Sequence, residues 1–283
     1  DRLQTDHVDF YLLHALFAER WHKMRDLGVL GWAERALADG RIRNFGFSFH
    51  DSFSAFKEII DAYDGWSFCQ IQYNYANTRV QAGTRGLRYA ASKGLAVVFM
   101  EPLLGGKLAN PPASIQAMWD AAPEHRSPVD WALQWIWDQP EVSVVLSGMS
   151  TMDQITGNLE SADRSRVGML NEAELIAVEE VSAKYQEICP IPCTQCEYCL
   201  PCTVGLQIPR LFEALNQGVM FDTIANERSR YASLPLESQA SACAQCRECE
   251  ARCPQHITIS EWMELVHQVL GEGRAYEEIV RRT

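Results

Sequence analysis

The stretch Val8-Asp9-Phe10-Tyr11-Leu12-Leu13 is the first of five short apolar runs that decide the fold of the first part of the chain. The other four runs cover residues 42–47, 68–73, 95–100 and 142–146. Each run is bounded by Gly, Pro or polar residues, as expected for strands that are buried on both faces of a sheet. These runs therefore predict five buried strands.

Amphipathic segments separate the runs and predict helices over about residues 21–38, 52–62, 80–93 and 127–138. The last of these has a clear start, because Ser127-Pro128 combines an N-cap residue with a proline at the first helical position. Five β/α repeats predict an α/β fold with a parallel sheet, either closed as a barrel or open and doubly wound.

Cysteine is concentrated in the last third of the chain. Cys69 stands alone in the first 188 residues, and the other nine of the ten cysteines fall between Cys189 and Cys253. A secreted disulfide scaffold would spread its cysteines over a small domain. The cluster of thiols instead indicates metal ligation in a reducing compartment, and we expect a cytoplasmic protein.

A helix over about residues 172–187 is predicted to connect the two parts. It begins at Asn171, with Glu174 three residues later as in a capping box. Strand signals are absent after this helix, and residues 209–230 and 258–280 have helical patterns. The predicted segments are 1–168 for the α/β domain, 169–188 for the linker helix and 189–283 for a mostly helical cysteine domain.

Two cysteine runs in this last domain have ferredoxin-like spacing. The second run, C-x2-C-x2-C-x3-C-P, matches the bacterial ferredoxin signature in full, whereas the first has x2 before its fourth cysteine and Thr203 in place of the proline. Three cysteines at x2 spacing can wrap one [4Fe–4S] cluster, and the fourth ligates the other cluster. The predicted ligands are Cys193, Cys196, Cys199 and Cys253 for cluster one, and Cys202, Cys243, Cys246 and Cys249 for cluster two.

The departure from the signature makes Cys202 the weakest member of this set, with Cys189 as a poorer substitute. The alternative interpretation is two structural zinc sites, each held by four thiolates. Zinc ribbons use separated C-x2-C pairs and do not need a triple. The spacing therefore favours two [4Fe–4S] clusters.

Length and charge exclude some classes of partner. The chain has 283 residues, enough for two domains, and a formal net charge of −12 at pH 7. An acidic surface repels phosphate backbones, so we expect no nucleic-acid partner. No apolar stretch approaches the ~18 to 20 residues that span a bilayer, so we expect no membrane segment.

Five segments of the first part resemble the aldo-keto reductases, in the order and at the intervals of that family. They cover residues 1 to about 165, and the ferredoxin-like appendage resembles that of the iron–sulfur subgroup. The segments are Asp6–His14 for the fourth barrel strand, Gly40–Ser48 for the fifth, Gln70–Asn74 for the sixth, Glu101–Gly106 after the seventh, and Ser147–Thr151 with Asn158-Leu159 for the eighth strand and its nucleotide-binding loop.

The resemblance implies strands 4–8 of a (β/α)8 TIM barrel, with the active site at the C-terminal strand ends. It implies hydride transfer between NADP(H) or NAD(H) and a small carbonyl or alcohol substrate. The implied roles are His14 as the catalytic residue that orients and polarises the carbonyl, Ser48 and Gln70 on the nicotinamide amide, and Gly148, Met149, Ser150, Thr151 and Asn158 in the nucleotide-binding loop.

The same resemblance places the family's catalytic Asp, Tyr and Lys on the first three β/α units, whereas this chain starts at the fourth strand. We therefore expect that roughly 90 to 110 residues of barrel are missing and that this fragment alone is inactive. Five of eight strands cannot close a barrel, so the outer strand edges should be exposed.

Three functions are compatible with these features. The leading hypothesis is an oxidoreductase of the aldo-keto reductase type that is coupled to electron transfer through two [4Fe–4S] clusters, with a redox protein as a further partner. The second is an electron-transfer module on a non-catalytic barrel that serves as a docking platform. The third is a structural role, in which the clusters only staple the C-terminal helices together.

Overall fold

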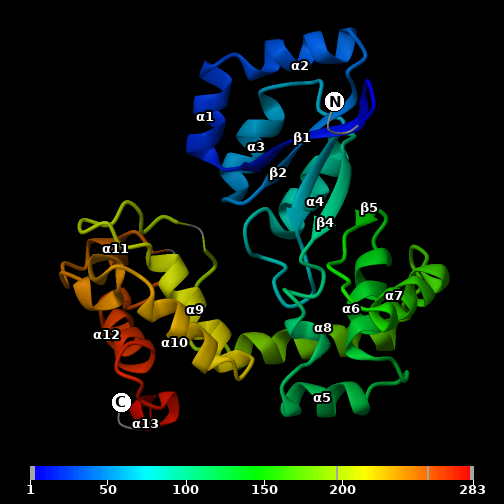
Figure 1. Cartoon of the computed structure of the whole chain (residues 1–283). Helices are drawn as coiled ribbons and strands as arrows, with labels where there is room; N and C mark the ends of the chain where they lie inside the picture. The colour runs from blue at the N-terminus through cyan, green and yellow to red at the C-terminus, as the bar shows by residue number, and fades with distance from the viewer. Residues whose placement is uncertain (1–3, 196, 254, 281–283) are drawn as a thin grey trace. The chain divides into compact units, whose positions relative to one another are not determined.

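The structure is a computed structural model, shown in Figure 1, and it describes residues 4–195, 197–253 and 255–280. The chain divides into two compact units. The first contains residues 1–110 and 121–179, and the second contains residues 111–120 and 180–283. Within the described residues, no helix has both the length and the apolar character needed to cross a membrane.

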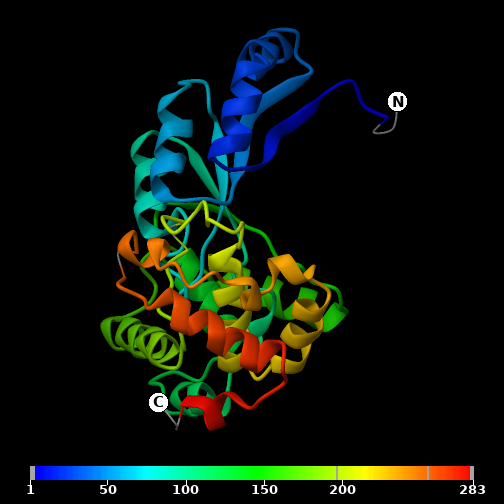
Figure 2. The same ribbon diagram turned by 90° about the vertical axis from the view of Figure 1, so that its left-hand side faces the viewer.

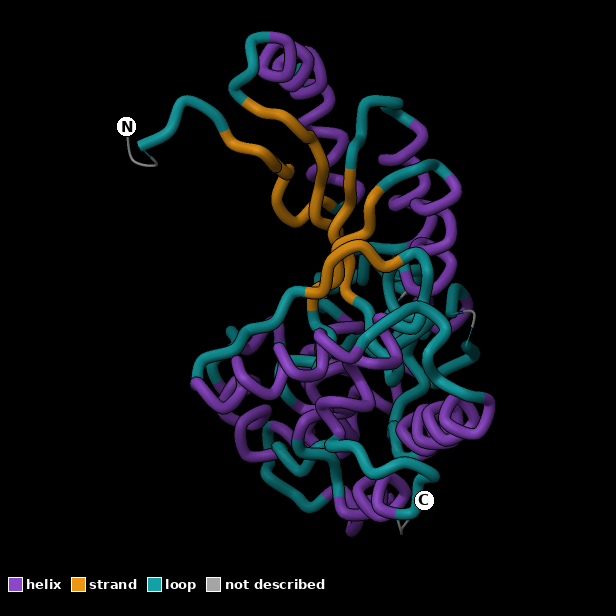
Figure 3. The backbone as a smooth tube through the Cα atoms, turned by 90° about the vertical axis from the view of Figure 1, so that its right-hand side faces the viewer, coloured by secondary structure: helices purple, strands orange, loops and turns teal. Residues whose placement is uncertain are grey.

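A five-stranded sheet forms the centre of the first unit (Figure 3). Its order is β1-β2-β3-β4-β5, and every neighbouring pair is parallel. The predicted α/β fold with five parallel strands is therefore confirmed. The strands are β1 (Val8–Leu16), β2 (Ile42–Phe49), β3 (Phe68–Gln72), β4 (Ala96–Met100) and β5 (Val142–Val145).

Helices connect the strands of this unit, and most match the predicted segments. The single helix predicted over 21–38 is wrong, because Gly28 adopts a left-handed conformation with φ of 77° and separates α1 from α2. The predicted cap of α6 is confirmed, since the Ser127 hydroxyl accepts a hydrogen bond from the Asp130 N–H at 3.1 Å. The helices are α1 (Ala18–Asp26), α2 (Val29–Ala38), α3 (Phe53–Asp61), α4 (Gly83–Ser92), α6 (Pro128–Trp137) and α7 (Met152–Arg164), with the 3₁₀ turn η1 (Lys107–Ala109).

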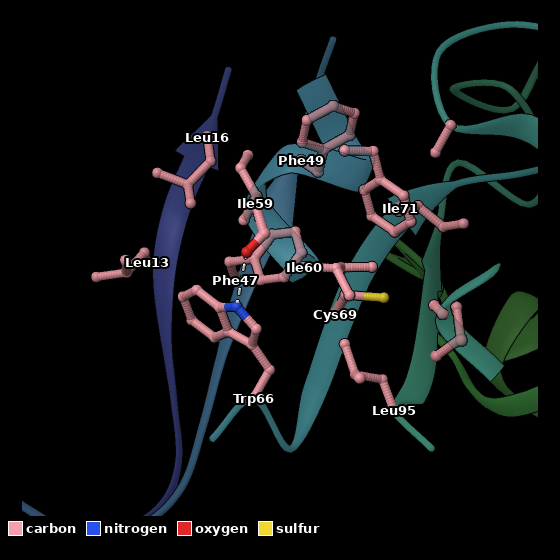
Figure 4. Close-up of a cluster of buried hydrophobic side chains, with 14 of the residues drawn as sticks. Leu13, Leu16, Phe47, Phe49, Ile59, Ile60, Trp66, Cys69, Ile71 and Leu95 are labelled. Carbon is pink, nitrogen blue, oxygen red and sulfur yellow. Dashed lines mark hydrogen bonds between the residues drawn. The ribbon is translucent and has the colours of Figure 1, made fainter. Parts of the chain in front are cut away.

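One face of the sheet packs against helices and forms an aromatic core (Figures 2 and 4). Phe45 and Phe47 of β2 lie against the Trp66 ring, each with a centroid distance of 4.8 Å. The Trp66 indole N–H donates to the Ile59 carbonyl at 3.0 Å, so its polar group is satisfied inside the core. Burial raises the pKa of the Cys69 thiol, and this residue packs as a small apolar side chain.

The prediction that all five strands are buried on both faces is wrong for the outer strands. Phe10 of β1 is 69% exposed and Val144 of β5 is 48% exposed. Each of these strands pairs with a single neighbour in the described sheet, so a second strand does not cover its outer side. Phe10 retains an edge-to-face contact with Phe68, with a ring-centroid distance of 5.6 Å. Gly46 leaves room for the Phe68 ring, because a Cβ atom at this position would collide with Phe68.

The second unit is built from helices and turns in its described residues. α8 (Glu172–Glu187) starts in the first unit and ends in the second, and its capping box is confirmed. The Glu174 N–H donates to Asn171 Oδ1 at 3.1 Å, and the Asn171 N–H donates to Glu174 Oε2 at 2.9 Å. The other helices are α5 (Ala113–Asp120), α9 (Ile208–Met220), α10 (Ile224–Ala232), α11 (Glu248–Ala251), α12 (Ile259–Leu270) and α13 (Tyr276–Val280), with 3₁₀ turns η2 (Leu236–Ser238) and η3 (Ala240–Ala242).

The two long helices predicted over 209–230 and 258–280 are each divided. Asp222 adopts a left-handed conformation between α9 and α10, with φ of 53°, and Gly273 does so between α12 and α13, with φ of 78°. Helices α9, α10 and α12 consequently pack on one another around a second apolar core (Figures 1 and 2).

Candidate functional sites

The C-terminal ends of β1, β2, β3 and β4 bring polar side chains side by side. Ser48 of β2 pairs in register with Gln70 of β3, and Ser48 is buried. The Ser48 hydroxyl accepts a hydrogen bond from the Ala15 N–H at 2.6 Å, one residue after the exposed His14. The Gln70 amide donates to Met100 Sδ at 3.6 Å. Three of the predicted site residues therefore lie along one edge of the sheet.

Left-handed backbone at non-glycine residues marks the same edge. Ala15 follows His14 with φ of 51°, and Glu101 follows β4 with φ of 58°. Such conformations cost about 1–3 kcal/mol each and are enriched at functional sites. Asn74 holds one of them in place, because its buried amide donates to the Glu101 carbonyl at 3.0 Å and its Oδ1 accepts from the Asn77 N–H at 2.9 Å.

Asn74 was not among the predicted site residues, although it ends the segment Gln70–Asn74. Its position after a buried strand was the signal that could have identified it.

His50 is a further residue at the C-terminal ends of the strands. Partial burial lowers the pKa of His50 and the neighbouring His14 acts in the same direction, while Gln81 and Glu101 oppose the shift. These side chains thus share one electrostatic environment.

A large groove lies next to this edge, within the first unit. Its volume is about 1090 Å³, which is enough for a dinucleotide-sized ligand. Three residues predicted for the nucleotide-binding loop line it, namely Gly148, Met149 and Asn158, and Met100 lines it as well. A Cβ atom built at Gly148 would meet nothing within 4 Å, so the backbone is open to a ligand there. His14, Ser48 and Gln70 are not among the lining residues, and Gln70 reaches the groove through its contact with Met100.

The loop that enters α7 contains the predicted Ser150 and Thr151. Thr151 caps the helix, accepting from the Gln154 N–H at 3.3 Å, and Gln154 Oε1 accepts from the Ser150 and Thr151 N–H groups at 2.8 and 3.3 Å. The backbone N–H groups of Ser150 and Thr151, two residues predicted for the nucleotide-binding loop, therefore already have a hydrogen-bond acceptor. Asn158 donates from its side-chain amide to the Ser147 hydroxyl at 3.0 Å and fixes the other end of the loop. Gln154 itself was missed, although a Gln three residues after a Thr is a capping-box signal.

Both arginines that line the groove are paired with carboxylates. Arg164 lies 2.9 Å from Asp130, and Arg126 forms an ion pair with the buried Glu174. Asp130 also accepts a hydrogen bond from the Ser161 hydroxyl at 2.5 Å. These pairs fix the wall of the groove that α6 and α7 provide.

The cysteines of the second unit gather in two places. Cys193, Cys199 and Cys253 line one small cavity, together with apolar residues such as Ile208 and Ile257. This combination of the first run with the last cysteine of the second run is the crossed set predicted for cluster one. Thiolate donors around an apolar wall fit an iron–sulfur cluster. The remaining predicted ligand, Cys196, lies outside the described residues.

The second group contains the predicted ligands of cluster two. Burial raises the pKa of the Cys249 thiol, and the nearby Glu250, Cys202 and Cys243 act in the same direction, so Cys202 and Cys243 lie near Cys249. Cys246 is exposed, and its Sγ lies 3.4 Å from the Thr203 hydroxyl. Cys202 therefore lies with the second run, as the crossed arrangement requires.

Cys189 precedes both cysteine runs in the sequence. Its thiol is within 3.3 Å of the Ile191 carbonyl, and burial raises its pKa to about 11. Among the described residues, no three His, Cys, Asp or Glu side chains have the spacing of a site for a single metal ion.

Comparison with known proteins gives two family matches. A model of the aldo/keto reductase family matches residues 1–182. A model of a 4Fe-4S dicluster domain matches residues 192–258. No curated protein matches the chain.

Solved structures of aldo-keto reductases are similar to 64% of this chain. One from Bacillus halodurans has 22% identity and a TM-score of 0.52 in its holo form, and 21% identity and a TM-score of 0.51 in its apo form. One from Klebsiella pneumoniae in complex with NADPH has 22% identity and a TM-score of 0.47. The match spans 60%, 64% and 61% of those three chains, which is less than two thirds of each. The likeness to the Bacillus halodurans structures shows the fold of the first unit.

Proposed function

The chain belongs to the aldo/keto reductase family and carries a 4Fe-4S dicluster domain, and on this basis we propose that it transfers hydride between a nicotinamide cofactor and a small carbonyl or alcohol. We couple this activity to electron transfer through two [4Fe–4S] clusters. One observation carries the proposal: the same chain places polar side chains at the C-terminal ends of parallel strands and brings together described cysteines from both runs.

In this proposal β1 to β5 are the fourth to eighth strands of a (β/α)8 barrel. Their uniform parallel pairing supports the assignment, because such a barrel uses parallel strands only. Active sites of these barrels lie at the C-terminal strand ends, where the polar edge of this sheet is found. The corresponding segments are 1–168 for this part of the barrel, 169–188 for the linker helix and 189–283 for the cluster domain.

A nicotinamide cofactor supplies or accepts a hydride when it is bound. His14 is exposed at the end of β1, and its imidazole can donate a hydrogen bond to a carbonyl oxygen and stabilise the negative charge that develops there. Ser48 fixes the backbone just after His14, and its hydroxyl proton remains available for the nicotinamide amide. Gln70 offers amide groups to the same part of the cofactor.

The groove beside this edge would hold the rest of the nucleotide. Gly148 and Met149 present open backbone ahead of α7, where the helix N-terminus favours a phosphate. Gln154 organises Ser150 and Thr151, and Asn158 lines the groove. Either NADP(H) or NAD(H) fits this arrangement, since the arginines of the groove are engaged by carboxylates.

Each [4Fe–4S] cluster supplies one-electron transfer when it is bound. Two such centres match the two electrons of a hydride, and a redox protein would be the external partner. We assign cluster one and cluster two to crossed cysteine sets, and the grouping of the described cysteines supports this. The sets are Cys193, Cys196, Cys199 and Cys253 for cluster one, and Cys202, Cys243, Cys246 and Cys249 for cluster two.

The hydride-transfer part is tested with His14→Gln in the full-length protein, prepared anaerobically with its full cluster content, using NAD(P)H oxidation by a small carbonyl. We expect kcat to fall by about 10²- to 10⁴-fold while nucleotide affinity, measured by fluorescence quenching, stays unchanged. His22→Gln is the matched control, because His22 pairs with Glu58 away from the strand ends. Unchanged turnover in His14→Gln would contradict the catalytic role. Nucleotide binding without any turnover in the native protein would favour the docking-platform function instead.

The cluster assignment is tested with Cys253→Ser, using iron and sulfide analysis together with integrated EPR signals of the reduced protein. We expect two clusters in the native protein and loss of the cluster-one signal in the variant. Cys189→Ser is the matched control and should retain both clusters, because the Cys189 thiol lies against the Ile191 carbonyl and is not a proposed ligand. A colourless native protein with stoichiometric zinc would reject the iron–sulfur assignment.

A further inference from the structure

Described residues of the two cysteine loops repeat the same unusual backbone conformation, offset by fifty residues. In the first loop Gln195 and Glu197 have φ of 55° and 64°, and in the second Gln245 and Arg247 have φ of 55° and 59°. Each pair occupies the same places, on either side of the second cysteine of its run. Non-glycine residues rarely adopt this conformation, so its repetition shows that both loops turn in the same way to aim their thiols.

The repeat continues beyond the fourth cysteine of each run. Gly205 and His256, each three residues after that cysteine, both have positive φ, of 80° and 53°. Helices α9 and α12 then begin at Ile208 and Ile259, each six residues after that cysteine. The residue directly after the fourth cysteine therefore has an equivalent in the other loop.

These equivalent positions hold chemically different residues, Thr203 in the first loop and Pro254 in the second. Threonine carries a hydroxyl that can donate a hydrogen bond, whereas the proline side chain cannot donate one. The Thr203 hydroxyl lies 3.4 Å from Cys246 Sγ, which is within hydrogen-bonding distance for sulfur. A cysteine that ligates iron is a thiolate without a proton, so in the loaded protein Thr203 must be the donor.

We infer that Thr203 is a positioning residue that raises the reduction potential of cluster two through this hydrogen bond. The inference rests on the proposed ligand sets, in which Cys246 belongs to cluster two. Reduction adds negative charge to a cluster, and a donor to a ligand sulfur stabilises that charge. The exposure of Cys246 acts in the same direction, because water also stabilises the reduced state. Thr203 thereby favours the reduced state of cluster two, so that the transferred electron stays on that cluster for longer.

Arg252 provides a second charge near the proposed ligands. Its guanidinium donates to the carbonyls of Cys199, Leu200 and Pro201 at 3.2 to 3.4 Å. Its charge should act on both clusters, because Cys199 is a proposed ligand of cluster one and Pro201 directly precedes Cys202 of cluster two. The effect of Thr203 must therefore be measured as a change in one midpoint potential relative to the other, with Arg252 left in place.

The test is an EPR-monitored redox titration of the complete chain, prepared anaerobically, with Thr203→Val and Thr203→Ser. Valine keeps the shape of threonine and removes the hydroxyl, while serine keeps the hydroxyl. We expect a negative shift of one of the two midpoint potentials in Thr203→Val, no shift in the other, and native values in Thr203→Ser. Thr223→Val is a control of the same chemistry outside the cysteine loops, since Thr223 bonds the Gln217 carbonyl.

Unmoved potentials in Thr203→Val, or equal shifts of both, would overturn the inference. The same holds if Thr203→Ser fails to restore the native value. If Thr203→Val assembles its clusters poorly, Thr203→Ala replaces it, with the same shift expected. An iron and sulfide content below two clusters in the native protein would overturn the cluster assignment together with the inference. Full cluster content with unmoved potentials would overturn the inference alone.

Discussion

The two units of the chain hold their functional residues by different means. In the first unit His14, Ser48 and Gln70 lie at one edge of a sheet whose opposite face carries a large aromatic core. In the second unit two of the proposed ligands are themselves part of the core, since Cys199 and Cys249 are buried among the apolar side chains of the packed helices. The residues at the strand ends of the first unit are held by an aromatic core of which they are not members. In the second unit, the proposed cluster site and the apolar core share residues, so each depends on the other.

This difference indicates how each unit should respond to loss of its cofactor. Cysteines that must converge on a bound cluster make cluster binding and folding depend on each other. Without the cluster, the strained turns of the cysteine loop are not offset by any bond to iron. A nucleotide groove beside a packed sheet has no such requirement. We therefore expect the second unit to be conditionally folded and the first to be independent of its ligand.

Removal of iron should produce the largest effect. After anaerobic chelation, trypsin should cleave at the exposed Arg247 and Arg252 on the order of tenfold faster or more, because both arginines lie in the second cysteine loop. Cleavage at exposed Arg41 and Lys57 of the first unit should keep its rate. Mass spectrometry of the time course reports both. Equal acceleration at all four positions would remove the contrast between the units.

Trp66→Ala should have the next largest effect, now confined to the first unit. Trp66 is 5% exposed, packs on Phe45 and Phe47, and donates to the Ile59 carbonyl. Loss of its ring should lower the free energy of unfolding of that unit by about 3–5 kcal/mol. Denaturation followed by circular dichroism measures this, and the visible absorbance of the clusters should be unaffected at concentrations that unfold the first unit. Parallel loss of the cluster absorbance would show that the second unit depends on the first.

Most of the fold could be predicted from the sequence, for identifiable reasons. The five strands are apolar runs with clear boundaries, and the caps at Ser127 and Asn171 are local patterns. The helix breaks at Gly28 and Asp222 were not predicted. An amphipathic pattern continues across a single left-handed residue, so periodicity alone does not reveal such a break. The exposure of Phe10 depends on which strands surround β1, and the composition of a strand does not specify that.

The candidate sites could be predicted where spacing carries the chemistry. The cysteine signature predicted that Cys253 would join the first run, and the cavity with Cys193 and Cys199 agrees with it. Asn74 and Gln154 were missed because each acts on backbone groups that only the folded loops bring within reach. The contact of Thr203 with Cys246 joins residues 43 positions apart and could not be inferred from either run alone.

Asn74→Ala should test how far the site of the first unit depends on its own polar contacts. Removing this buried amide takes away one of two donors to the Glu101 carbonyl, which keeps the Leu104 N–H at 3.1 Å, so the free energy of unfolding should fall by about 0.5–1.5 kcal/mol. The strained backbone at Glu101 should also relax, so nucleotide affinity should fall. Asn77→Ala is the control, because Asn77 contributes its backbone N–H to Asn74 and retains it in the variant. Loss of stability without loss of affinity would separate Glu101 from the nucleotide site.

Asp61→Asn should give the smallest effect, at the surface of the first unit. Hydrogen bonds from Lys57, Tyr89 and Lys93 lower the pKa of the Asp61 carboxyl. Because the pKa of this carboxyl is lower in the folded state than in the unfolded state, where it is about 3.9, the ionised group stabilises the folded protein at pH values above 3.9. This contribution is lost as the pH falls through the pKa of the folded state. Because the group is exposed, solvent screens the pairs and the difference in denaturation midpoint between variant and native protein should be small at pH 7. It should shrink further as the pH is lowered below 4. A difference that grows in acid would mean that the carboxyl is stabilised in its protonated form, and the surface network of α3 and α4 would then need another explanation.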